Sequence, residues 1–461
     1  MAINVVIMAA GKGTRMKSAL PKVLHQLGGT TLLQHVLAAA AGVGAGRTVV
    51  VTGHGAEEVE AAVANSGAAC VRQMPQLGTG HAVQQAIPAL DDALAVTLIL
   101  YGDVPLIRAA TGAALVQACG GQSLALLSFE PQDPARYGRI VRGSDGGVQA
   151  IVEYKDASPA QRAITEVYSG IMAAPTAALK RWAAALKNDN AQAEYYLTDV
   201  VAMAVAEGMA VTTQVVADEA EVAGINDAGQ LAALERVLQR RQAAALMEAG
   251  VRLADPARIE VRGTLRCGSD VEIDVNCIFE GAVTLGDGVH IGVNCVIRDA
   301  HIAAGAVIHP FTHIEGAQVG PGALVGPYAR LRPGAVLGAE VHIGNFVEVK
   351  NSTLAAGAKA NHLAYLGDAT VGARVNFGAG SITANYDGAN KHRTTIGDDV
   401  QVGSNCVLVA PVTLGAGATI GGGSTVAEDA PAGQLTVARA RQVTLPGWQR
   451  PKKVPKGPKT T

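Results

Sequence analysis

The sequence predicts an α/β protein with an N-terminal domain built on a mostly parallel sheet, a connecting helix and a C-terminal parallel β-helix. Aliphatic runs alternate with Ala/Leu-rich segments up to about Gly224, an amphipathic segment follows, and aliphatic residues then recur at every sixth position. The composition agrees, because 55 of 461 residues are glycine and only 3% are aromatic. Average proteins contain about 7% glycine. We therefore expect an aliphatic core and many tight turns.

The N-terminal half alternates two kinds of segment. The short strand-like runs are Asn4–Ala9, Arg47–Thr52, Ala95–Tyr101 and Ser123–Phe129, and the helical segments are Leu32–Ala41, His81–Leu90 and Thr111–Cys119. This alternation is typical of a three-layer α/β domain. Because ligands of such sheets bind beyond the carboxyl ends of the strands, we expect the chemistry there.

The connecting helix is predicted to run to about Gly250. Either Asn226 or Asp227 can cap its first turn. One face carries the leucines Leu231, Leu234 and Leu238. We therefore divide the chain into a first domain at residues 1–226, a linker helix at 227–250, a β-helix domain at 251–445 and a flexible tail at 446–461.

The second half has a period of six residues. Aliphatic residues occupy two unbroken runs, Val319, Val325, Leu331, Leu337, Ile343 and Val349, then Ile396, Val402, Leu408, Leu414, Ile420 and Val426. With small residues and glycines between them, these positions indicate a hexapeptide parallel β-helix whose aliphatic side chains point inward. An ordinary β-sandwich would show a period of two. A polar segment, Ser381–Arg393, interrupts the repeat, and long excursions of this kind are usually functional.

Charge and composition exclude several classes of function. The net charge of −2 argues against nucleic-acid binding, and no run of about 18 apolar residues could span a membrane. The six cysteines form neither a CxxC pair nor a His/Cys cluster, so we expect no zinc site and no disulfide framework. The apolar N-terminus lacks a preceding basic region and is interpreted as a buried strand, not a signal peptide. We expect a cytoplasmic protein. Its Pro/Lys-rich end, 451–461, is either a disordered solvated tail or an attractor of anions.

A glycine-containing loop follows the first predicted strand. It has the sequence Ala9-Ala-Gly-Lys-Gly-Thr-Arg-Met16, and Pro21-Lys-Val-Leu24 comes shortly after it. Glycines let the backbone approach a phosphate, whose oxygens exposed N–H groups can bind. Arg15 and Lys22 can neutralise a triphosphate. Met16 stands where a dinucleotide fingerprint needs its third glycine, and the sequence contains no Walker A motif.

Further motifs follow in an order that resembles a known family. They are Gln76–His81, Tyr101–Pro105, Tyr137–Arg139, Val152–Lys155 and Glu194–Asp199. Together with the loop at Ala9–Arg15, they are similar to the signature of sugar nucleotidyltransferases. With the hexapeptide repeat behind them, the chain resembles the family of bifunctional bacterial N-acetylglucosamine-1-phosphate uridyltransferases / glucosamine-1-phosphate acetyltransferases. The resemblance runs from about Val5 to Arg450.

For the N-terminal half, the resemblance implies a Rossmann-like nucleotidyltransferase domain that couples UTP to N-acetylglucosamine 1-phosphate and releases pyrophosphate. The sugar phosphate is already anionic near neutral pH, because its second pKa is about 6, so no general base is needed. The resemblance assigns Mg²⁺ to Asp103 and Asn226, and the triphosphate to Arg15 and Lys22. It assigns UTP or UDP-N-acetylglucosamine contacts to Ala9, Gly11, Lys22, Gln73, Gly78, Thr79, Gly138, Glu153, Tyr168, Tyr196, Thr198 and Asn226.

Several of these residues have simpler alternatives when they are considered singly. Asp103 can cap a turn, and Glu153 can pair with Lys155 on an exposed strand. Tyr168 departs from the family pattern, which usually has Asn there, so an amide contact to the sugar phosphate is lost.

For the C-terminal half, the resemblance implies a left-handed parallel β-helix that transfers the acetyl group of acetyl-CoA to glucosamine 1-phosphate. The attacking amine must be neutral, and histidine has a suitable pKa for the base. The family's base matches His362, and its orienting carboxylate matches Glu348. The glucosamine-phosphate contacts match Arg332, Lys350, Tyr365 and Asn376. The acetyl-CoA contacts match Asn385, Tyr386, Lys391, Ser404, Gly422 and Arg439, the last of which could instead be a surface charge.

The resemblance also implies a homotrimer with active sites between neighbouring β-helices, and small-molecule substrates. From the net charge and the lack of a long apolar run, we expect neither nucleic acid nor membrane as partner. Acetylation would come first, and the product UDP-N-acetylglucosamine would feed cell-envelope polysaccharide synthesis. Two alternatives remain. A single-activity nucleotidyltransferase with a structural or regulatory β-helix would have no reason to carry His362, Glu348 and Lys391. A non-enzymatic assembly subunit would have lost Arg15, Lys22 or Asp103, and all three are present.

Overall fold

The computed structural model describes residues 2–134 and 137–453, which divide into two compact units. The first unit extends to Ala249 and includes Asp255–Thr264 and Phe279–Gly281. The second unit comprises Gly250–Ala254, Leu265–Ile278 and the chain from Ala282 onward. The predicted domain limits at residues 226, 250 and 445 stay predictions.

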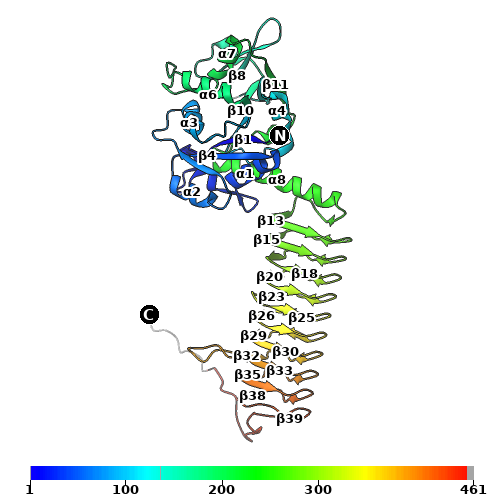
Figure 1. Ribbon diagram of the computed structural model, residues 1–461. Coiled ribbons are helices and arrows are strands. Elements are labelled where there is room, and N and C mark those ends of the chain that lie inside the picture. Colours follow the sequence, from blue (N-terminus) through cyan, green and yellow to red (C-terminus); the bar gives the residue numbers. More distant parts are fainter. Residues whose placement is uncertain (1, 135–136, 454–461) are drawn as a thin grey trace, which may run out of the picture. The chain divides into compact units, whose positions relative to one another are not determined.

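The first unit is built on a twisted, mixed sheet (Figure 1). Its strands are β1 (Ile3–Met8), β4 (Ala45–Thr52), β5 (Ala69–Arg72), β6 (Val96–Tyr101), β7 (Leu124–Phe129), β10 (Val167–Pro175) and β11 (Val211–Val215). Their order is β11-β7-β10-β6-β1-β4-β5, and neighbours are parallel except that β10 runs antiparallel to β6 and β7. The hairpin β8 (Arg139–Arg142) and β9 (Val148–Val152) extends from β10, and β2 (Gln26–Leu27) pairs separately with β3 (Thr30–Thr31). The prediction of a mostly parallel α/β sheet is confirmed.

Helices pack on both faces of this sheet: α1 (Leu32–Val43), α2 (Ala56–Val63) and α4 (Ala109–Cys119) on one face, and α3 (Thr79–Ala86), α6 (Thr176–Ala185) and α7 (Asp199–Ala206) on the other. The unit also contains α5 (Pro159–Arg162), α8 (Ala228–Glu248) and the short 3₁₀ turns η1 (Thr14–Met16), η2 (Lys22–Leu24), η3 (Ile87–Ala89) and η4 (Glu219–Glu221). Alternate residues of β1 point to opposite faces, so that Val5 packs with α1, α2 and α4, whereas Val6 packs with α3, α6 and α7. The two apolar layers therefore hold the sheet between them and fix the position of the strand ends.

The helix ends follow local chemistry. In α1, the Thr31 hydroxyl accepts a hydrogen bond from the Gln34 N–H (3.2 Å), and the Gln34 side chain bonds the Thr31 N–H (3.1 Å), which is a capping box. The helix predicted over His81–Leu90 is displaced: α3 begins at Thr79 and gives way to η3 after Ala86. Pro88 explains the early end, because proline has no N–H to continue the α-helical ladder.

Helix α8, predicted as the connecting arm, belongs to the first unit. Asp227 caps it by accepting from the Gln230 N–H (2.9 Å). The buried side chain of Gln239 exchanges two hydrogen bonds with the backbone of Val261 (2.9 and 2.8 Å). This polar pair and the buried Leu234 hold the helix on the unit's own surface.

The second unit is a parallel β-helix whose short strands stack coil upon coil (Figure 1). One sheet contains β12 (Arg252–Leu253), β14 (Glu272–Ile273), β16 (His290–Ile291), β19 (Val307–Ile308), β22 (Leu324–Val325), β25 (His342–Asn345), β28 (Lys359–His362), β31 (Asn376–Phe377), β34 (Gln401–Val402), β37 (Thr419–Ile420) and β39 (Leu435–Thr436). The other faces contain β17 (Val296–Arg298), β18 (His301–Ile302), β20 (His313–Glu315), β21 (Gln318–Val319), β23 (Arg330–Leu331), β24 (Val336–Leu337), β26 (Glu348–Lys350), β27 (Thr353–Leu354), β29 (Tyr365–Gly367), β30 (Ala369–Val371), β32 (Ile382–Ala384), β33 (Thr394–Ile396), β35 (Val407–Val409), β36 (Val412–Leu414) and β38 (Thr425–Val426). Strands β13 (Ile259–Cys267) and β15 (Cys277–Leu285) carry residues of both units.

The sixfold period marks the interior of the β-helix. All twelve residues of the two predicted runs are at most 2% exposed. In the parallel register, Val325 lies opposite Ile343, which lies opposite Ala360 in the next coil. The prediction that these side chains point inward is confirmed.

The polar excursion begins later than predicted. Ser381 is buried and β32 pairs in parallel with β35, so the excursion loop spans residues 385–393. The polar residues before it stay in the coil because they are satisfied there: the Ser381 hydroxyl donates to the Gly403 carbonyl (2.7 Å) and the Thr383 hydroxyl to the Gly367 carbonyl (3.0 Å). Most of the predicted disordered tail, residues 454–461, lies outside the described residues.

Two candidate active sites

The loop after β1 approaches Lys22 closely. Gly13 has a φ of +58°, and a Cβ atom there would lie 2.7 Å from the Cβ of Lys22. Only glycine fits this position without displacing Lys22. The loop is anchored beside the sheet, because the Gln76 side chain donates to the Ala10 carbonyl (2.7 Å). The backbone around Gly11 is therefore held next to the Lys22 side chain.

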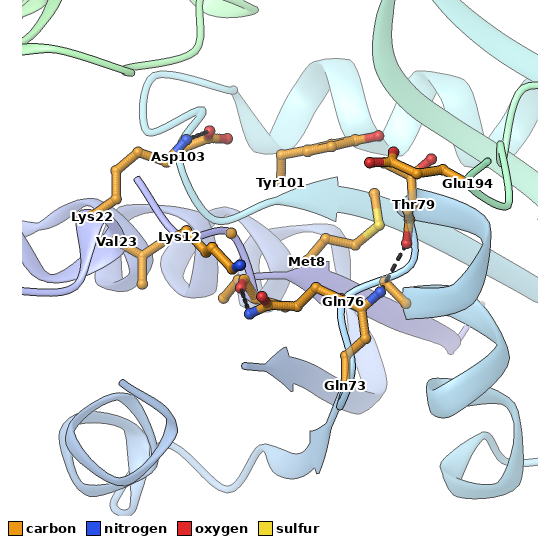
Figure 2. Close-up of a pocket in the computed structure, with 15 residues that line it drawn as sticks. Met8, Lys12, Lys22, Val23, Gln73, Gln76, Thr79, Tyr101, Asp103 and Glu194 are labelled. Carbon is orange, nitrogen blue, oxygen red and sulfur yellow. Dashed lines mark hydrogen bonds and ion pairs between the residues drawn. The ribbon is translucent and has the colours of Figure 1, made fainter. Parts of the chain in front are cut away.

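A cavity of about 440 Å³ opens at the carboxyl ends of β1 and β6 (Figure 2). Its lining residues are Met8, Ala9, Ala10, Gly11, Lys12, Lys22, Val23, Gln73, Gln76, Gly78, Thr79, Ala82, Tyr101, Asp103 and Glu194. Lys22 and Asp103 lie side by side at one end in Figure 2, and Thr79 and Glu194 lie at the other. Of the residues predicted to contact the nucleotide, Ala9, Gly11, Lys22, Gln73, Gly78 and Thr79 come together here.

Gln73 and Gly78 form a fixed wall of this cavity. The buried Gln73 amide donates to the Gly78 carbonyl (2.8 Å). Gly78 has a φ of +102°, and a Cβ there would lie 2.7 Å from the Tyr195 carbonyl oxygen. Glycine is required on both counts, so the cavity wall depends on the residue type that the motif supplies.

A second cavity of about 600 Å³ adjoins the first. Thr79, Tyr101 and Asp103 line both. The predicted residues Arg15, Gly138, Glu153, Tyr168, Thr198 and Asn226 line the second cavity. The second cavity is therefore lined by residues predicted to bind the phosphates, the sugar and the metal, and the first by residues predicted to bind the nucleotide. The two sets adjoin at Asp103, which lines both cavities.

Three polar groups converge where the cavities adjoin. The Lys22 ammonium group forms an ion pair with the Asp103 carboxylate and also donates to the Asn226 side-chain oxygen (3.2 Å). A carboxylate oxygen and an amide oxygen thus face one cationic group. Among residues 2–134 and 137–453, no cluster of three or more His, Cys, Asp or Glu side chains could hold a metal ion.

Glu153 is the carboxylate of the second cavity. It accepts a hydrogen bond from the Thr198 hydroxyl (3.2 Å). Burial raises its pKa, the Thr198 bond opposes this, and the nearby Asp156, Asp199 and Glu194 raise the pKa further. The protonated form of Glu153 is therefore favoured relative to an exposed glutamate.

Tyr168 and Tyr196 have their hydroxyl groups already engaged. Tyr168 is 5% exposed and donates to the Gly170 carbonyl (2.6 Å). Burial raises its pKa well above the ordinary tyrosine value, so the hydroxyl remains a neutral donor. Tyr196 accepts from Gln192 (2.8 Å) and donates to Asp156 (3.2 Å), and it is not among the described residues that line either cavity.

Sequence reasoning missed several lining residues. They are Lys12, Gln76, Tyr101, Tyr137 and Glu194. Each lies in one of the motifs quoted above, so the signal was present, but a motif does not say which side chains face the ligand. Tyr101 is the last residue of β6, where the carboxyl-end rule would have placed it.

In the second unit, His362 ends β28 and is exposed. Its Nδ1 lies 2.9 Å from the side-chain oxygen of Asn345, one coil earlier. Because an amide oxygen can only accept, this hydrogen bond requires a proton on Nδ1, which leaves the lone pair of a neutral imidazole on Nε2. Asn345 was not singled out from the sequence.

Glu348, the predicted partner of His362, has different neighbours within the chain. Its carboxylate accepts from Arg332 (2.9 Å) and lies 3.6 Å from Arg330. In the parallel register it lies opposite Tyr365 in the next coil. Arg332, Glu348 and Tyr365, all predicted site residues, therefore share one face of the β-helix.

Two lysines meet on the same side. The side chains of Lys350 and Lys391 lie close together, and the proximity of Lys391 lowers the pKa of Lys350. Arg332 adds to the positive charge. Such a cluster of cations is suited to a phosphate dianion.

The excursion loop is a small ordered hairpin. Tyr386 and Lys391 form an antiparallel bridge across it. The Asp387 carboxylate accepts hydrogen bonds from the N–H groups of Ala389 (2.8 Å) and Asn390 (2.6 Å) and from Nε2 of His392 (2.7 Å). These bonds lower the pKa of Asp387. The loop thereby presents Tyr386, which is 61% exposed, outward.

The remaining predicted residues lie in two places. Asn376 lies on β31, between Lys359 and Gln401 in the register of adjacent coils. The Arg439 guanidinium donates to the Gly422 carbonyl, and the Gly423 N–H donates to the Ser404 carbonyl (2.8 Å). The structure thus brings Ser404, Gly422 and Arg439 together.

The two units define a nucleotidyltransferase joined to a hexapeptide acyltransferase. Residues 5–252 match the model of the MobA-like NTP transferase domain, residues 393–428 match the bacterial transferase hexapeptide model (six repeats), and residues 261–355 match the GMPPB C-terminal domain. Within the described part of the chain, no helix is both long enough and apolar enough to cross a membrane.

Curated relatives identify the family. The chain is 73% identical over 458 residues to the "Bifunctional protein GlmU" of Methylibium petroleiphilum, covering 98% of this chain and 99% of the relative. It is 68% identical to the protein of the same name from Polaromonas naphthalenivorans, covering 98% of both chains. It is 59% identical to that of Ralstonia pickettii, covering 98% of this chain and 99% of the relative. The chain belongs to the GlmU family of bifunctional proteins.

Family membership confirms the predicted fold class and function. The chain is an α/β enzyme with a nucleotidyltransferase domain and a left-handed β-helix of hexapeptide repeats. It is both an N-acetylglucosamine-1-phosphate uridyltransferase and a glucosamine-1-phosphate N-acetyltransferase, and UTP and acetyl-CoA are its co-substrates. The alternatives of a single activity and of a non-enzymatic subunit are set aside.

Proposed function

We propose that uridylyl transfer takes place where the two cavities of the first unit adjoin. The observation that carries this proposal is that Asp103, Tyr101 and Thr79 line both cavities. The first cavity would hold the uridine of UTP against Gln73 and Gly78. The second would hold N-acetylglucosamine 1-phosphate beside Gly138, Glu153 and Thr198, with Tyr168 as an apolar wall and Tyr196 behind it.

The chemical step needs positioning and charge neutralisation. An anionic oxygen of the sugar phosphate attacks the α-phosphorus of UTP, a P–O bond forms, and the bond to the leaving pyrophosphate breaks. Arg15 and Lys22 neutralise the triphosphate while the walls hold the two substrates in line. Tyr101 and Tyr168 are kept protonated by burial and so add no negative charge.

The residues at the junction suit Mg²⁺. The Asp103 carboxylate and the Asn226 amide oxygen already converge on one cationic group, the Lys22 ammonium. Mg²⁺ takes one or two protein oxygens and completes its shell with phosphates and water, which suits a site with one carboxylate. Asp103 and Asn226 would hold the ion, which would supply positive charge to the phosphates. Lys22 would then turn toward the triphosphate.

We propose that acetyl transfer takes place around His362. The Nε2 lone pair takes a proton from the amine of glucosamine 1-phosphate as the nitrogen attacks the thioester carbonyl of acetyl-CoA. A C–N bond forms, the C–S bond breaks, and coenzyme A leaves as the thiol after taking up a proton. Asn345 fixes the required tautomer through its bond to Nδ1.

The other predicted residues bind the substrates of this step. Arg332, Lys350, Tyr365 and Asn376 would bind the sugar phosphate, and the Glu348 carboxylate would hold Arg332 in place. A role for Glu348 in orienting His362 would need a rearrangement of its ion pair with Arg332. Acetyl-CoA would lie along Asn385, Tyr386, Lys391, Ser404, Gly422 and Arg439.

The assembly that fits these assignments is a homotrimer in the cytoplasm. His362 and Tyr386 are exposed on the single chain, and an acetylation site that excludes water requires a cover. A neighbouring β-helix would supply it, as the hexapeptide family suggests. We retain residues 1–226 as the uridyltransferase domain, 227–250 as linker helix and 251–445 as acetyltransferase domain.

The test uses one purified sample and two assays. The first follows free thiol released from acetyl-CoA with glucosamine 1-phosphate. The second follows pyrophosphate released from UTP with N-acetylglucosamine 1-phosphate, with Mg²⁺ and after its removal by EDTA. We expect activity in both assays and Mg²⁺ dependence in the second alone. Pyrophosphate release that survives EDTA would overturn the metal assignment.

A further inference from the structure

Asp368 occupies a corner of the β-helix beside the acetyl-transfer site, and the assignments above give it no role. The residue is 7% exposed and has a φ of +50°, a conformation in which Asp and Asn are enriched. One carboxylate oxygen accepts from the Asn351 amide (2.5 Å), and the other accepts from the Asn385 amide. Both oxygens are therefore occupied by side chains from other coils.

These bonds join two parts of the proposed site. Asn351 directly follows Lys350, and Asn385 directly precedes Tyr386 at the root of the excursion loop. Backbone hydrogen bonds join the same two parts: the Asp368 N–H donates to the Lys350 carbonyl (3.1 Å), and the Thr394 N–H donates to the Asp368 carbonyl (3.2 Å). Asp368 is thus bonded next to both ends of the loop and to the strand that carries Lys350.

The charge of Asp368 lies among cations. Lys350 faces Lys391, Arg332 and Asp368, and the first two oppose its protonation while Asp368 favours it. Burial raises the pKa of Asp368, but the bonds from Asn351 and Asn385 and the charges of Lys350 and Lys391 lower it overall. The carboxylate is therefore ionised and compensates the repulsion between two ammonium groups.

We propose that Asp368 is a positioning residue of the acetyl-transfer site, which fixes the root of the excursion loop to the Lys350 strand and holds Lys350 and Lys391 together on the phosphate of glucosamine 1-phosphate. This inference rests on the proposed phosphate site. Asp368 touches neither substrate and acts through Lys350, Lys391 and Asn385.

The experiment measures KM for glucosamine 1-phosphate against pH in the full-length enzyme. In Asp368→Asn, the side chain keeps its size but loses its charge, so Lys350 loses its proton at lower pH. We expect KM to rise about tenfold near pH 8, and its increase with pH to begin about one pH unit earlier than in the wild type. Asp368→Glu, which keeps the charge, should restore the pH profile of KM while lowering kcat through a displaced loop.

Asp299→Asn is the matched control. Asp299 is another aspartate at a left-handed corner (φ +44°), where it accepts a bond from the Ala282 N–H (2.9 Å). It is exposed and belongs to an earlier coil, so its substitution should leave the KM profile unchanged. The folding of the β-helix is checked on each sample by thermal melting followed by circular dichroism, because pyrophosphate release reports only the first unit.

The outcomes separate this inference from the proposed function. If Lys350→Ala raises KM and the profile of Asp368→Asn coincides with that of the wild type, the inference fails and the phosphate site stands. If Lys350→Ala leaves KM unchanged, the phosphate site itself fails. An Asp368→Asn enzyme that melts earlier but keeps the wild-type KM profile assigns Asp368 a structural role alone and overturns the proposal.

Discussion

The folded protein disfavours the charged form of the Glu153 carboxyl group, and the resulting loss of folding stability can be measured. Its pKa is raised by burial and by neighbouring carboxylates, so the folded protein binds a proton there more tightly than the unfolded chain. Above the raised pKa of the folded protein, the charged carboxylate lowers the free energy of unfolding by its full amount. Below the unfolded pKa of about 4.5, the group is protonated in both states and this loss of stability vanishes. We predict that Glu153→Gln increases the free energy of unfolding at pH 7, and that the gain disappears as the pH falls below this value. Urea titrations between pH 4 and pH 8 measure it.

Glu166 supplies a control of opposite sign. Burial acts to raise its pKa, but the bonds from Arg142 and Ser128 outweigh burial and lower it. Its contribution to stability is therefore present above the unfolded pKa and is lost on acidification. Glu166→Gln should lower the free energy of unfolding at pH 7. Equal signs for the two substitutions would contradict the environments described here.

Residue identity was predictable where chemistry restricts it, and side-chain partners were not. The family motifs led to Asp103 and Lys22, which the structure brings into contact. They also led to Tyr196, whose hydroxyl is hydrogen-bonded to Asp156 and Gln192 and which is not among the described residues that line the two cavities. Partners such as Asn345 for His362 depend on which residues of adjacent coils lie in register, 17 positions apart, and spacing alone does not fix that alignment.

At the scale of elements, the inward column of the β-helix carries its stability. Ile343 is fully buried between Val325 and Ala360 of the adjacent coils. We predict that Ile343→Ala costs about 2–5 kcal/mol, the usual cost of deleting a buried aliphatic side chain. Leu324→Ala, on the outward face of the neighbouring coil and 37% exposed, should cost no more than about 0.5 kcal/mol.

The loss should be confined to the β-helix, because each coil contacts only its neighbours. Acetyltransferase activity should therefore decline at lower urea concentration than uridyltransferase activity in Ile343→Ala. Parallel assays along one urea titration check this. A simultaneous loss of both activities would mean that the two units unfold together.

The period of six made the β-helix predictable, because an aliphatic residue that recurs at the same place in every strand points into the interior each time. Interruptions were harder to place. Ser381 and Thr383 have the polarity of a loop, but both are buried and bonded to backbone carbonyls inside the coil. In the first unit, Pro88 ends α3 earlier than the apolar pattern suggested. In each case the end of the element was decided by which backbone groups could form hydrogen bonds. The pattern of hydrophobic residues does not report this.

At the scale of the whole molecule, the chain carries two activities whose proposed sites share no residue. The residues proposed for uridylyl transfer belong to the first compact unit, and those proposed for acetyl transfer belong to the second. The product of acetylation, N-acetylglucosamine 1-phosphate, is small and water-soluble, so it can diffuse from one site to the other. Two sites on one chain therefore need not act in concert.

This independence gives the last prediction. Asp103→Asn should reduce pyrophosphate release at least a hundredfold, since it removes the carboxylate that we propose to hold Mg²⁺ beside the phosphates, and it should spare thiol release. His362→Gln should reduce thiol release by 10²–10⁴-fold, the usual contribution of a general base, and spare pyrophosphate release. An equimolar mixture of the two variants, given glucosamine 1-phosphate, acetyl-CoA and UTP, should then release both products, because each variant supplies the step that the other lacks. If the mixture releases thiol but no pyrophosphate although His362→Gln alone is active with N-acetylglucosamine 1-phosphate, the intermediate does not pass freely between molecules and the sites are coupled.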